Sequence, residues 1–114
     1  MEQRKHTRHQ VEFPGTFSDG GGSSGSGMVI DLSSEGCRVR RESAIVTGNY
    51  VRLLINLRGR DIPLTVSLAV IRWSTGNEFG VEFIRMTQDE QRLLRHVITT
   101  IEAKAIGEEQ QAFN

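Results

Sequence analysis

The chain has 114 residues, a length that fits one domain and can bury a hydrophobic core of its own. Its 14 basic and 14 acidic residues cancel, which argues against a protein that binds duplex nucleic acid through net charge. There is no run of about 18 apolar residues and no apolar N-terminal stretch, so we expect no membrane insertion and a cytoplasmic location.

The N-terminal part of the chain is basic and then rich in glycine. Residues 1–9 contain no apolar residue after Met1, which predicts a flexible arm until a ligand orders it. Val11–Ser18 carries spaced apolar residues and predicts a first strand. Asp19–Gly27 is almost entirely glycine and serine, so we expect a connector without structure of its own.

Two short segments then predict a pair of strands. Met28–Leu32 is a short apolar run, and Cys37–Arg40 alternates apolar with basic residues, as a strand with one wet face does. Ser33–Gly36 lies between them and has the composition of a turn. Together they predict the second and third strands.

The middle of the chain shows the clearest alternation of period two. Val51–Leu57 predicts a fourth strand after a turn at Gly48. A polar turn at Arg58–Asp61 leads into Ile62–Val70, which predicts a long fifth strand. Pro63 is compatible with a position near the start of a strand.

The last third of the chain changes from strand to helix. A turn at Gly76 precedes Phe79–Phe83, the predicted sixth strand. Thr87 and Glu90 have the spacing of a capping box, and apolar residues then recur at helical spacing. We predict one amphipathic helix over residues 87–106, ended by Gly107.

The order of these elements predicts a mainly β fold. Six short strands followed by one helix favour a six-stranded antiparallel β-barrel with one C-terminal α-helix. The predicted helix covers an open end of the barrel or packs on a partner. We expect residues 1–9 to form the arm, 10–106 the barrel and helix, and 107–114 a frayed tail.

No feature of the sequence indicates catalysis or a metal site. Cys37 is the one cysteine, and with three scattered histidines it forms no zinc-binding pattern. Its place in an alternating segment favours a buried thiol. The sequence has no paired-carboxylate motif and no nucleophile motif. We therefore expect neither an enzyme nor a metal or other cofactor.

Two polar segments stand apart from this scaffold. Arg4 and Arg8 lie four residues apart in the arm. Asp31, Ser33 and Gly36 lie in the segment that follows the second predicted strand. Each segment alone is a weak indication of a ligand site, because arginine pairs and serine/glycine turns are common.

Together, in this order, the two segments resemble the PilZ domain family. That family carries an Arg-x-x-x-Arg motif followed by Asp/Asn-x-Ser-x-x-Gly, and both motifs are matched in full. The turn at Gly48, residues 70–73, residues 80–83 and the closing helix are also similar to the family. The resemblance implies a six-stranded barrel with a C-terminal helix that binds the bacterial second messenger cyclic di-GMP.

The chemistry of the five motif residues agrees with that ligand. Arg4 and Arg8 can each hold a phosphate through paired N–H groups or stack on a purine. Asp31 can accept from the N–H edge of guanine, and Ser33 can donate to the ligand. Gly36 allows a positive φ and a close backbone approach. Two alternatives stay open: Asp31 caps its own turn, and Gly36 serves turn geometry alone.

Four further residues are weaker candidates for ligand binding. Trp73 ends the fifth strand near the family's ligand position, where it stacks on a guanine or caps the barrel core. Arg38 and Arg40 flank the turn and add phosphate contacts or form a solvated face. Lys5 lies in the arm and adds positive charge.

The sequence thus predicts a cyclic di-GMP receptor that orders its arginine arm on binding and signals to a protein effector not yet identified. The helix segment Leu93–Ile101 is a candidate partner surface if the barrel does not bury it. One alternative is a PilZ-like adapter that does not bind the nucleotide. Another is a small barrel that binds single-stranded nucleic acid, which zero net charge and the inward spacing of Phe79 and Phe83 disfavour.

Overall fold

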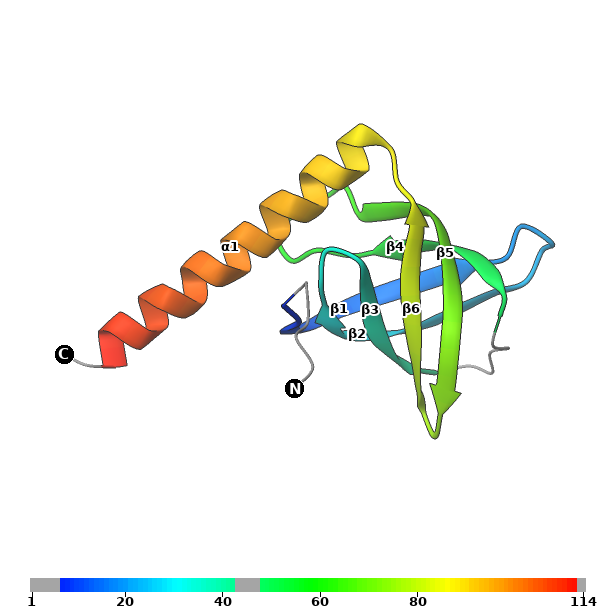
Figure 1. The fold of residues 1–114 in the computed structure, drawn as a ribbon, viewed down its shortest axis with the longest axis horizontal. Helices are drawn as coiled ribbons and strands as arrows, with labels where there is room; N and C mark the ends of the chain where they lie inside the picture. The colour runs from blue at the N-terminus through cyan, green and yellow to red at the C-terminus, as the bar shows by residue number, and fades with distance from the viewer. Residues whose placement is uncertain (1–6, 43–47, 113–114) are drawn as a thin grey trace, which may run out of the picture.

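The computed structural model describes residues 7–42 and 48–112, with side chains described as far as Lys104. Six strands form a closed antiparallel barrel in the order β1-β2-β3-β6-β5-β4 (Figure 1). The elements are β1 (His9–Ser18), β2 (Ser24–Leu32), β3 (Gly36–Arg41), β4 (Tyr50–Ile55), β5 (Leu64–Thr75), β6 (Glu78–Arg85) and α1 (Gln88–Ala112). The predicted fold class is confirmed.

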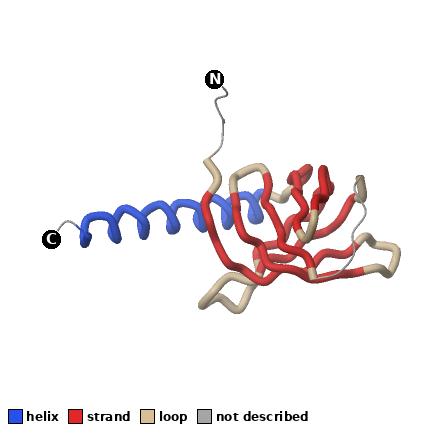
Figure 2. Tube along the Cα trace, turned by 90° about the horizontal axis from the view of Figure 1, so that it is seen from below, coloured by secondary structure: helices blue, strands red, loops and turns tan. Residues whose placement is uncertain are grey.

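The barrel closes where β1 meets β4. Gly15 of β1 lies opposite Ile55 of β4, and the same stretch of β1 pairs on its other edge with β2. Because the barrel is closed, these strands have no free edge whose unpaired N–H and C=O groups could pair with another chain. The strands wrap around a single core (Figure 2).

Alternation along each strand sends one set of side chains into the barrel. The largest fully buried side chains come from the five strands β2 to β6. They are Phe79, Leu32, Leu53, Ile55, Leu64, Ile71, Val29, Val39, Val66 and Cys37. Phe17 of β1 meets Phe79 edge to face, with ring centroids 5.3 Å apart. The Cys37 side chain belongs to this core, as predicted.

The expectation that Asp19–Gly27 has no structure is wrong for its second half. Ser24–Gly27 is the first part of β2, and Ser18 pairs with Ser24. A Cβ at Gly27 would lie 2.7 Å from the Arg40 carbonyl oxygen. Glycine is therefore needed here because β2 and β3 approach closely, whereas composition alone indicated flexibility.

The fifth strand starts and ends later than predicted. β5 begins at Leu64 rather than Ile62, which stays 74% exposed. Pro63 has no N–H for the ladder, so pairing starts after it. The strand then continues past Val70 to Thr75, which places Trp73 within the sheet.

The helix begins as predicted but is longer. The Glu90 amide donates to Thr87 Oγ1 at 3.1 Å, and the Thr87 amide donates to Glu90 Oε1 at 3.1 Å, which confirms the capping box. α1 continues through Gly107 to Ala112. A glycine inside a helix costs about 1 kcal/mol of stability. The residues that follow Gly107 have high helix propensity, so the helix continues through it.

The first half of α1 packs on the barrel. Leu94 and Val97 are buried in the core, and α1 contacts β5. Glu90 fixes this end, because its carboxylate accepts from the Ser67 hydroxyl at 2.8 and 2.9 Å. The condition set for Leu93–Ile101 as a partner surface therefore fails for Leu94 and Val97, whereas Leu93, Ile98 and Ile101 are only partly buried. The distal part of α1 extends beyond the barrel (Figures 1 and 2).

Candidate functional site

The two predicted motifs meet at the end of the barrel where β1 begins. Arg8 directly precedes β1, and Asp31 lies near the end of β2. Gln10 pairs with Asp31 across the β1–β2 ladder, which brings the start of β1 beside that carboxylate. Arg8 Nη1 donates to Asp31 Oδ1 at 2.8 Å. The arginine side chain is still 41% exposed, and this bond uses a single N–H of the five that a guanidinium carries.

Asp31 is buried and holds a second arginine as well. Its Oδ1 accepts from the backbone amide of Arg38 at 3.1 Å, and its Oδ2 lies 3.2 Å from Arg38 Nε. That Nε is buried and has no well-directed hydrogen bond, so its attraction to the carboxylate is electrostatic. Arg8 and Arg38 thus converge on the Asp31 carboxylate from two different elements.

Ser33 organises the turn between β2 and β3. Its hydroxyl accepts from the amides of Glu35 and Gly36, each at 3.2 Å. The same hydroxyl donates to the Gly36 carbonyl, which also accepts from the Ser33 amide at 2.8 Å. The serine therefore forms an ST-type turn that fixes the path of the chain from Asp31 to Arg38.

Gly36 is required for packing rather than for a positive φ. The glycines with positive φ in the described residues are Gly20, Gly22, Gly48, Gly59 and Gly76. A Cβ at Gly36 would lie 2.3 Å from the carbonyl oxygen of Val81 in β6. The expectation of a positive φ is wrong, whereas the expected close backbone approach is present.

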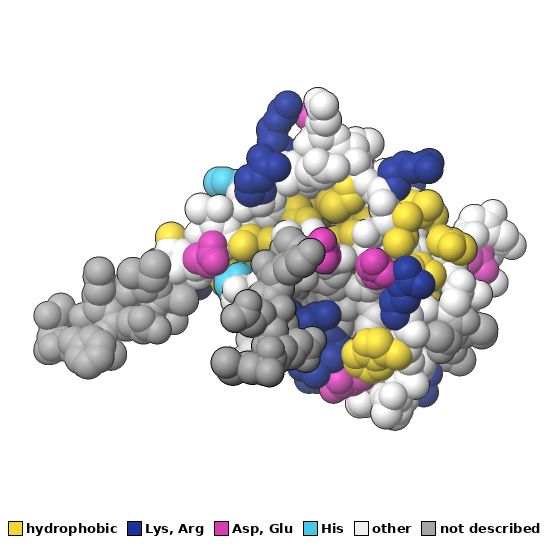
Figure 3. All heavy atoms as spheres, in the orientation of Figure 1, with side chains coloured by type: hydrophobic (Ala, Val, Ile, Leu, Met, Phe, Trp, Pro, Cys, Tyr) yellow, Lys and Arg dark blue, Asp and Glu magenta, His cyan; other side chains and the backbone are white. Residues whose placement is uncertain are grey.

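A row of outward-facing positions runs from Asp31 across the sheet. Asp31 pairs with Arg38, Arg38 with Gly80, and Gly80 with Trp73. A Cβ at Gly80 would lie 2.1 Å from Trp73 Nε1, so the indole rests on this glycine. Trp73 is 41% exposed and therefore does not cap the core. Figure 3, seen from this side of the barrel, shows basic, acidic and hydrophobic side chains side by side.

The other predicted site residues fall into two groups. Arg4 and Lys5 lie outside the described residues. Arg40 is exposed on β3, two residues from Arg38. Among the described residues no hydrogen bond or ion pair joins Arg40 to Asp31, and the arginine lines a neighbouring groove.

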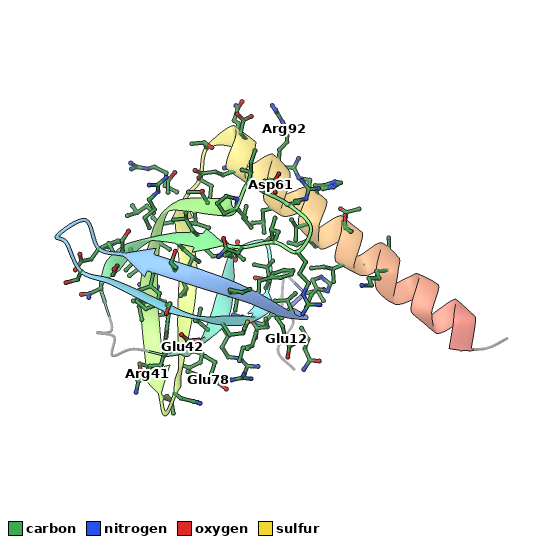
Figure 4. All side chains as sticks on the ribbon, turned by 180° about the vertical axis from the view of Figure 1, so that it is seen from behind. Glu12, Arg41, Glu42, Asp61, Glu78 and Arg92 are labelled. Atoms are coloured by element: carbon green, nitrogen blue, oxygen red, sulfur yellow. The ribbon has the colours of Figure 1, made fainter. Side chains whose placement is uncertain are left out.

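Two neighbours of the site were not predicted. Glu78 of β6 has Oε1 3.5 Å from Arg38 Nε, and Figure 4 shows it beside the β5–β6 hairpin. His9 Nε2 lies 3.6 Å from Glu102 Oε2, which connects the start of β1 with α1. Glu78 could have been found from its outward position in the alternation of β6, but the contact between His9 and α1 depends on how the helix docks.

Cys37 lies beneath this site, inside the barrel. Burial raises the pKa of its thiol well above the ordinary value, and the Asp31 carboxylate raises this pKa further. Arg8 opposes the shift. The thiol is thus held neutral as part of the core. Among the described residues, no group of three or more His, Cys, Asp or Glu side chains could hold a metal ion.

Comparison with known proteins identifies the family. The family model described as PilZ domain matches residues 2–99. A comparison with curated protein sequences gives no significant match. No helix within residues 7–42 and 48–112 is long and apolar enough to cross a membrane.

Solved structures with the same fold are distant in sequence. The PilZ domain of YcgR from Escherichia coli, solved with c-di-GMP, has a TM-score of 0.75 at 15% identity, and the match covers 96% of this chain and 98% of that one. The PilZ domain of CeSA from a cellulose-synthesizing bacterium gives 0.67 at 16% identity, covering 84% and 98%. The Bacillus subtilis inhibitor of motility MotI gives 0.71 at 14% identity, covering 94% of this chain but 53% of MotI.

The closed six-stranded barrel with its single C-terminal helix and the family-model match define the class of this protein as a PilZ-type β-barrel domain. The chain belongs to the PilZ domain family.

Proposed function

We propose that this PilZ domain is a receptor for cyclic di-GMP. The observation that carries the proposal is the 2.8 Å contact between Arg8 Nη1 and Asp31 Oδ1, which joins two motifs 23 residues apart. It supports a single site built from both motifs. The similar barrel of YcgR, solved with c-di-GMP, supports the same ligand.

The exposed groups at this site suit the two kinds of group in the ligand, its phosphates and its guanines. Arg8 keeps N–H groups available for a phosphate, and Arg38 offers a second guanidinium, 40% exposed. The exposed indole of Trp73 offers a flat face for a guanine. Asp31 accepts from Arg8 Nη1 and from the Arg38 backbone amide, so its main contribution is to orient the two arginines. A remaining lone pair can accept from a guanine N–H.

We further propose that the segment before Arg8 closes over the ligand. Arg4 and Lys5 would add contacts to phosphate from that segment. Ordering each residue costs about 1–2 kcal/mol of backbone entropy, which charge-assisted bonds of about 1.5–3 kcal/mol each can offset. The ordered arm then presents a new surface to a protein effector, in a bacterial cytoplasm.

Calorimetric titration of the intact chain with cyclic di-GMP tests the proposal. We expect binding by the unaltered chain and at least tenfold weaker binding by Arg8→Ala, because a charge-assisted contact is lost. Arg92→Ala is the matched control, since that arginine is exposed on α1 and, among the described residues, pairs only with Asp89. Its affinity should be unchanged. Absence of heat with the unaltered chain at tens of micromolar would refute the proposal.

Circular dichroism of each variant must show a retained fold. Cyclic di-AMP serves as the specificity control, because it keeps both phosphates and lacks the guanine N–H edge. Equal affinity for both dinucleotides would contradict a role for guanine recognition. The adapter alternative predicts that amide NMR signals near Arg8 do not move on titration. The single-stranded nucleic-acid alternative predicts retention of oligonucleotides that falls with salt.

A further inference from the structure

A concave surface lies next to the candidate site, on the β1 side of Asp31. It is a groove of about 630 Å³ between the barrel wall, the loop after β4 and the second half of α1. We refer to it as the α1 groove, and the lining residues that matter for its chemistry are Glu12, Ile30, Arg40, Arg58, Ile101 and Lys104. Its volume lies in the range of about 300–1,000 Å³ that is usual for small-molecule sites.

Three cations converge on the α1 groove from different elements. Arg40 comes from β3, Arg58 from the loop after β4 and Lys104 from α1. Within the described part of the chain, none of the three has an ion pair or hydrogen bond to a carboxylate. Three like charges that share a concave surface with one described carboxylate, Glu12, leave an excess of positive potential there. This arrangement is unfavourable for folding and favourable for binding an anion.

The floor of the α1 groove is apolar and its rim holds one acid. Ile30 and Ile101 are half-buried, so a flat ring can rest on them. Glu12 is the single acidic side chain among the described lining residues, and Figure 4 shows it on β1 near the end that faces α1. A carboxylate beside cations suits a ligand that carries both phosphate and N–H donors, as a guanine nucleotide does.

The α1 groove neighbours the candidate site through Gln10. Gln10 lines the groove and is the ladder partner of Asp31. His9, between Gln10 and Arg8, contacts Glu102 of α1. The groove therefore begins one strand away from the carboxylate that holds Arg8.

We propose that the α1 groove binds the phosphate groups of a guanine nucleotide through Arg40, Arg58 and Lys104. The inference rests on the proposed function, because the nucleotide is the same cyclic dinucleotide. Its phosphate can come from two sources. One is the far phosphate of a single ligand held at Arg8, and the other is a second ligand molecule in the groove.

Calorimetry of the intact chain with cyclic di-GMP separates these sources. The variant is Arg58→Gln/Lys104→Gln, and the control is Arg52→Gln/Arg92→Gln, which removes the same charge from exposed positions outside the groove. A single bridging ligand predicts affinity at least tenfold weaker with unchanged stoichiometry. A second ligand predicts that the stoichiometry falls from two to one.

Two results would overturn the proposal. One is unchanged affinity and stoichiometry in the groove variant. The other is an equal loss in the control, which would assign the effect to net charge alone. The melting temperatures of both variants must match that of the unaltered chain, which excludes a defect in the fold. The variant Arg58→Lys/Lys104→Arg keeps both positive charges and should bind as the unaltered chain does.

A separate probe keeps this inference distinct from the proposed function. If the unaltered chain gives no heat with cyclic di-GMP, the proposed function fails, and titration with 5′-GMP by amide NMR then tests the groove alone. We expect shifts at Ile30, Arg58 and Ile101 that disappear in the Arg58→Gln/Lys104→Gln variant. Unmoved amides at these three positions in the unaltered chain would overturn the groove proposal.

Discussion

Replacement of Asp31 separates the two tasks that its carboxylate performs in the fold. Asp31→Asn keeps a side-chain oxygen that can accept from the Arg38 amide, but it removes the charge that attracts Arg8. Asp31→Ala removes the acceptor as well. Comparison of the two variants therefore distinguishes the hydrogen bond from the ion pair.

The expected magnitudes follow from the burial of each partner. An Arg38 amide left unpaired and partly buried costs about 1–3 kcal/mol. The ion pair to Arg8 contributes about 0.2–1 kcal/mol, because that arginine is 41% exposed and screened by water. We expect Asp31→Asn to lower the free energy of unfolding by about 1 kcal/mol and Asp31→Ala by about 3 kcal/mol.

Urea denaturation followed by far-UV circular dichroism measures the difference. At about 4 °C per kcal/mol for a domain of this size, the alanine variant should also melt about 8 °C below the asparagine variant. Asp61→Ala is the control, because Asp61 is exposed and has no ion pair or hydrogen bond within the described residues. Equal midpoints for Asp31→Asn and Asp31→Ala would refute the assignment of a structural hydrogen bond to this carboxylate.

Three further predictions test the packing around the site. Gly36→Ala should lower the melting temperature by about 10 °C, because its Cβ would press on a β6 carbonyl. Gly21→Ala should change it by less than about 2 °C, because its Cβ would meet only the exposed Asp19 side chain, at an ordinary contact distance of 3.4 Å; similar values for the two variants would contradict the close-approach argument. Ser67→Ala should lower the free energy of unfolding by about 1 kcal/mol, because the hydroxyl bonds to Glu90 are lost. An unchanged urea midpoint would show that these bonds between β5 and α1 contribute nothing to stability. Cys37 should resist a thiol-reactive disulfide reagent at pH 8 until the chain unfolds, since burial raises its thiol pKa and keeps the thiolate scarce; rapid reaction of the native protein would contradict this.

Sequence patterns predicted most of the barrel for local reasons. Alternation of period two indicated the strands, and the Thr87–Glu90 box marked the start of α1, because both signals come from neighbouring residues. The start of β2 was missed because its glycines, including Gly27, serve a close approach to β3. Composition cannot distinguish that use of glycine from flexibility.

The candidate site was also predicted in part. The motifs named Arg8, Asp31, Ser33 and Gly36, and the structure brings these residues to one end of the barrel. Arg4 and Lys5 lie outside the described residues and stay predictions. Ser33 forms hydrogen bonds within its own turn and Gly36 accommodates the close approach of β6, whereas their contacts with a ligand stay predictions.

The sequence by itself determined the number of strands, the capped helix and the two motifs, since each of these is encoded within a short stretch of chain. Only the tertiary structure decided which residues share a surface. Barrel register places Arg38, Gly80 and Trp73 in one row, and the docking of α1 brings Lys104 towards Arg40. These juxtapositions depend on strand pairing and helix packing between distant segments, and no local pattern specifies either of them.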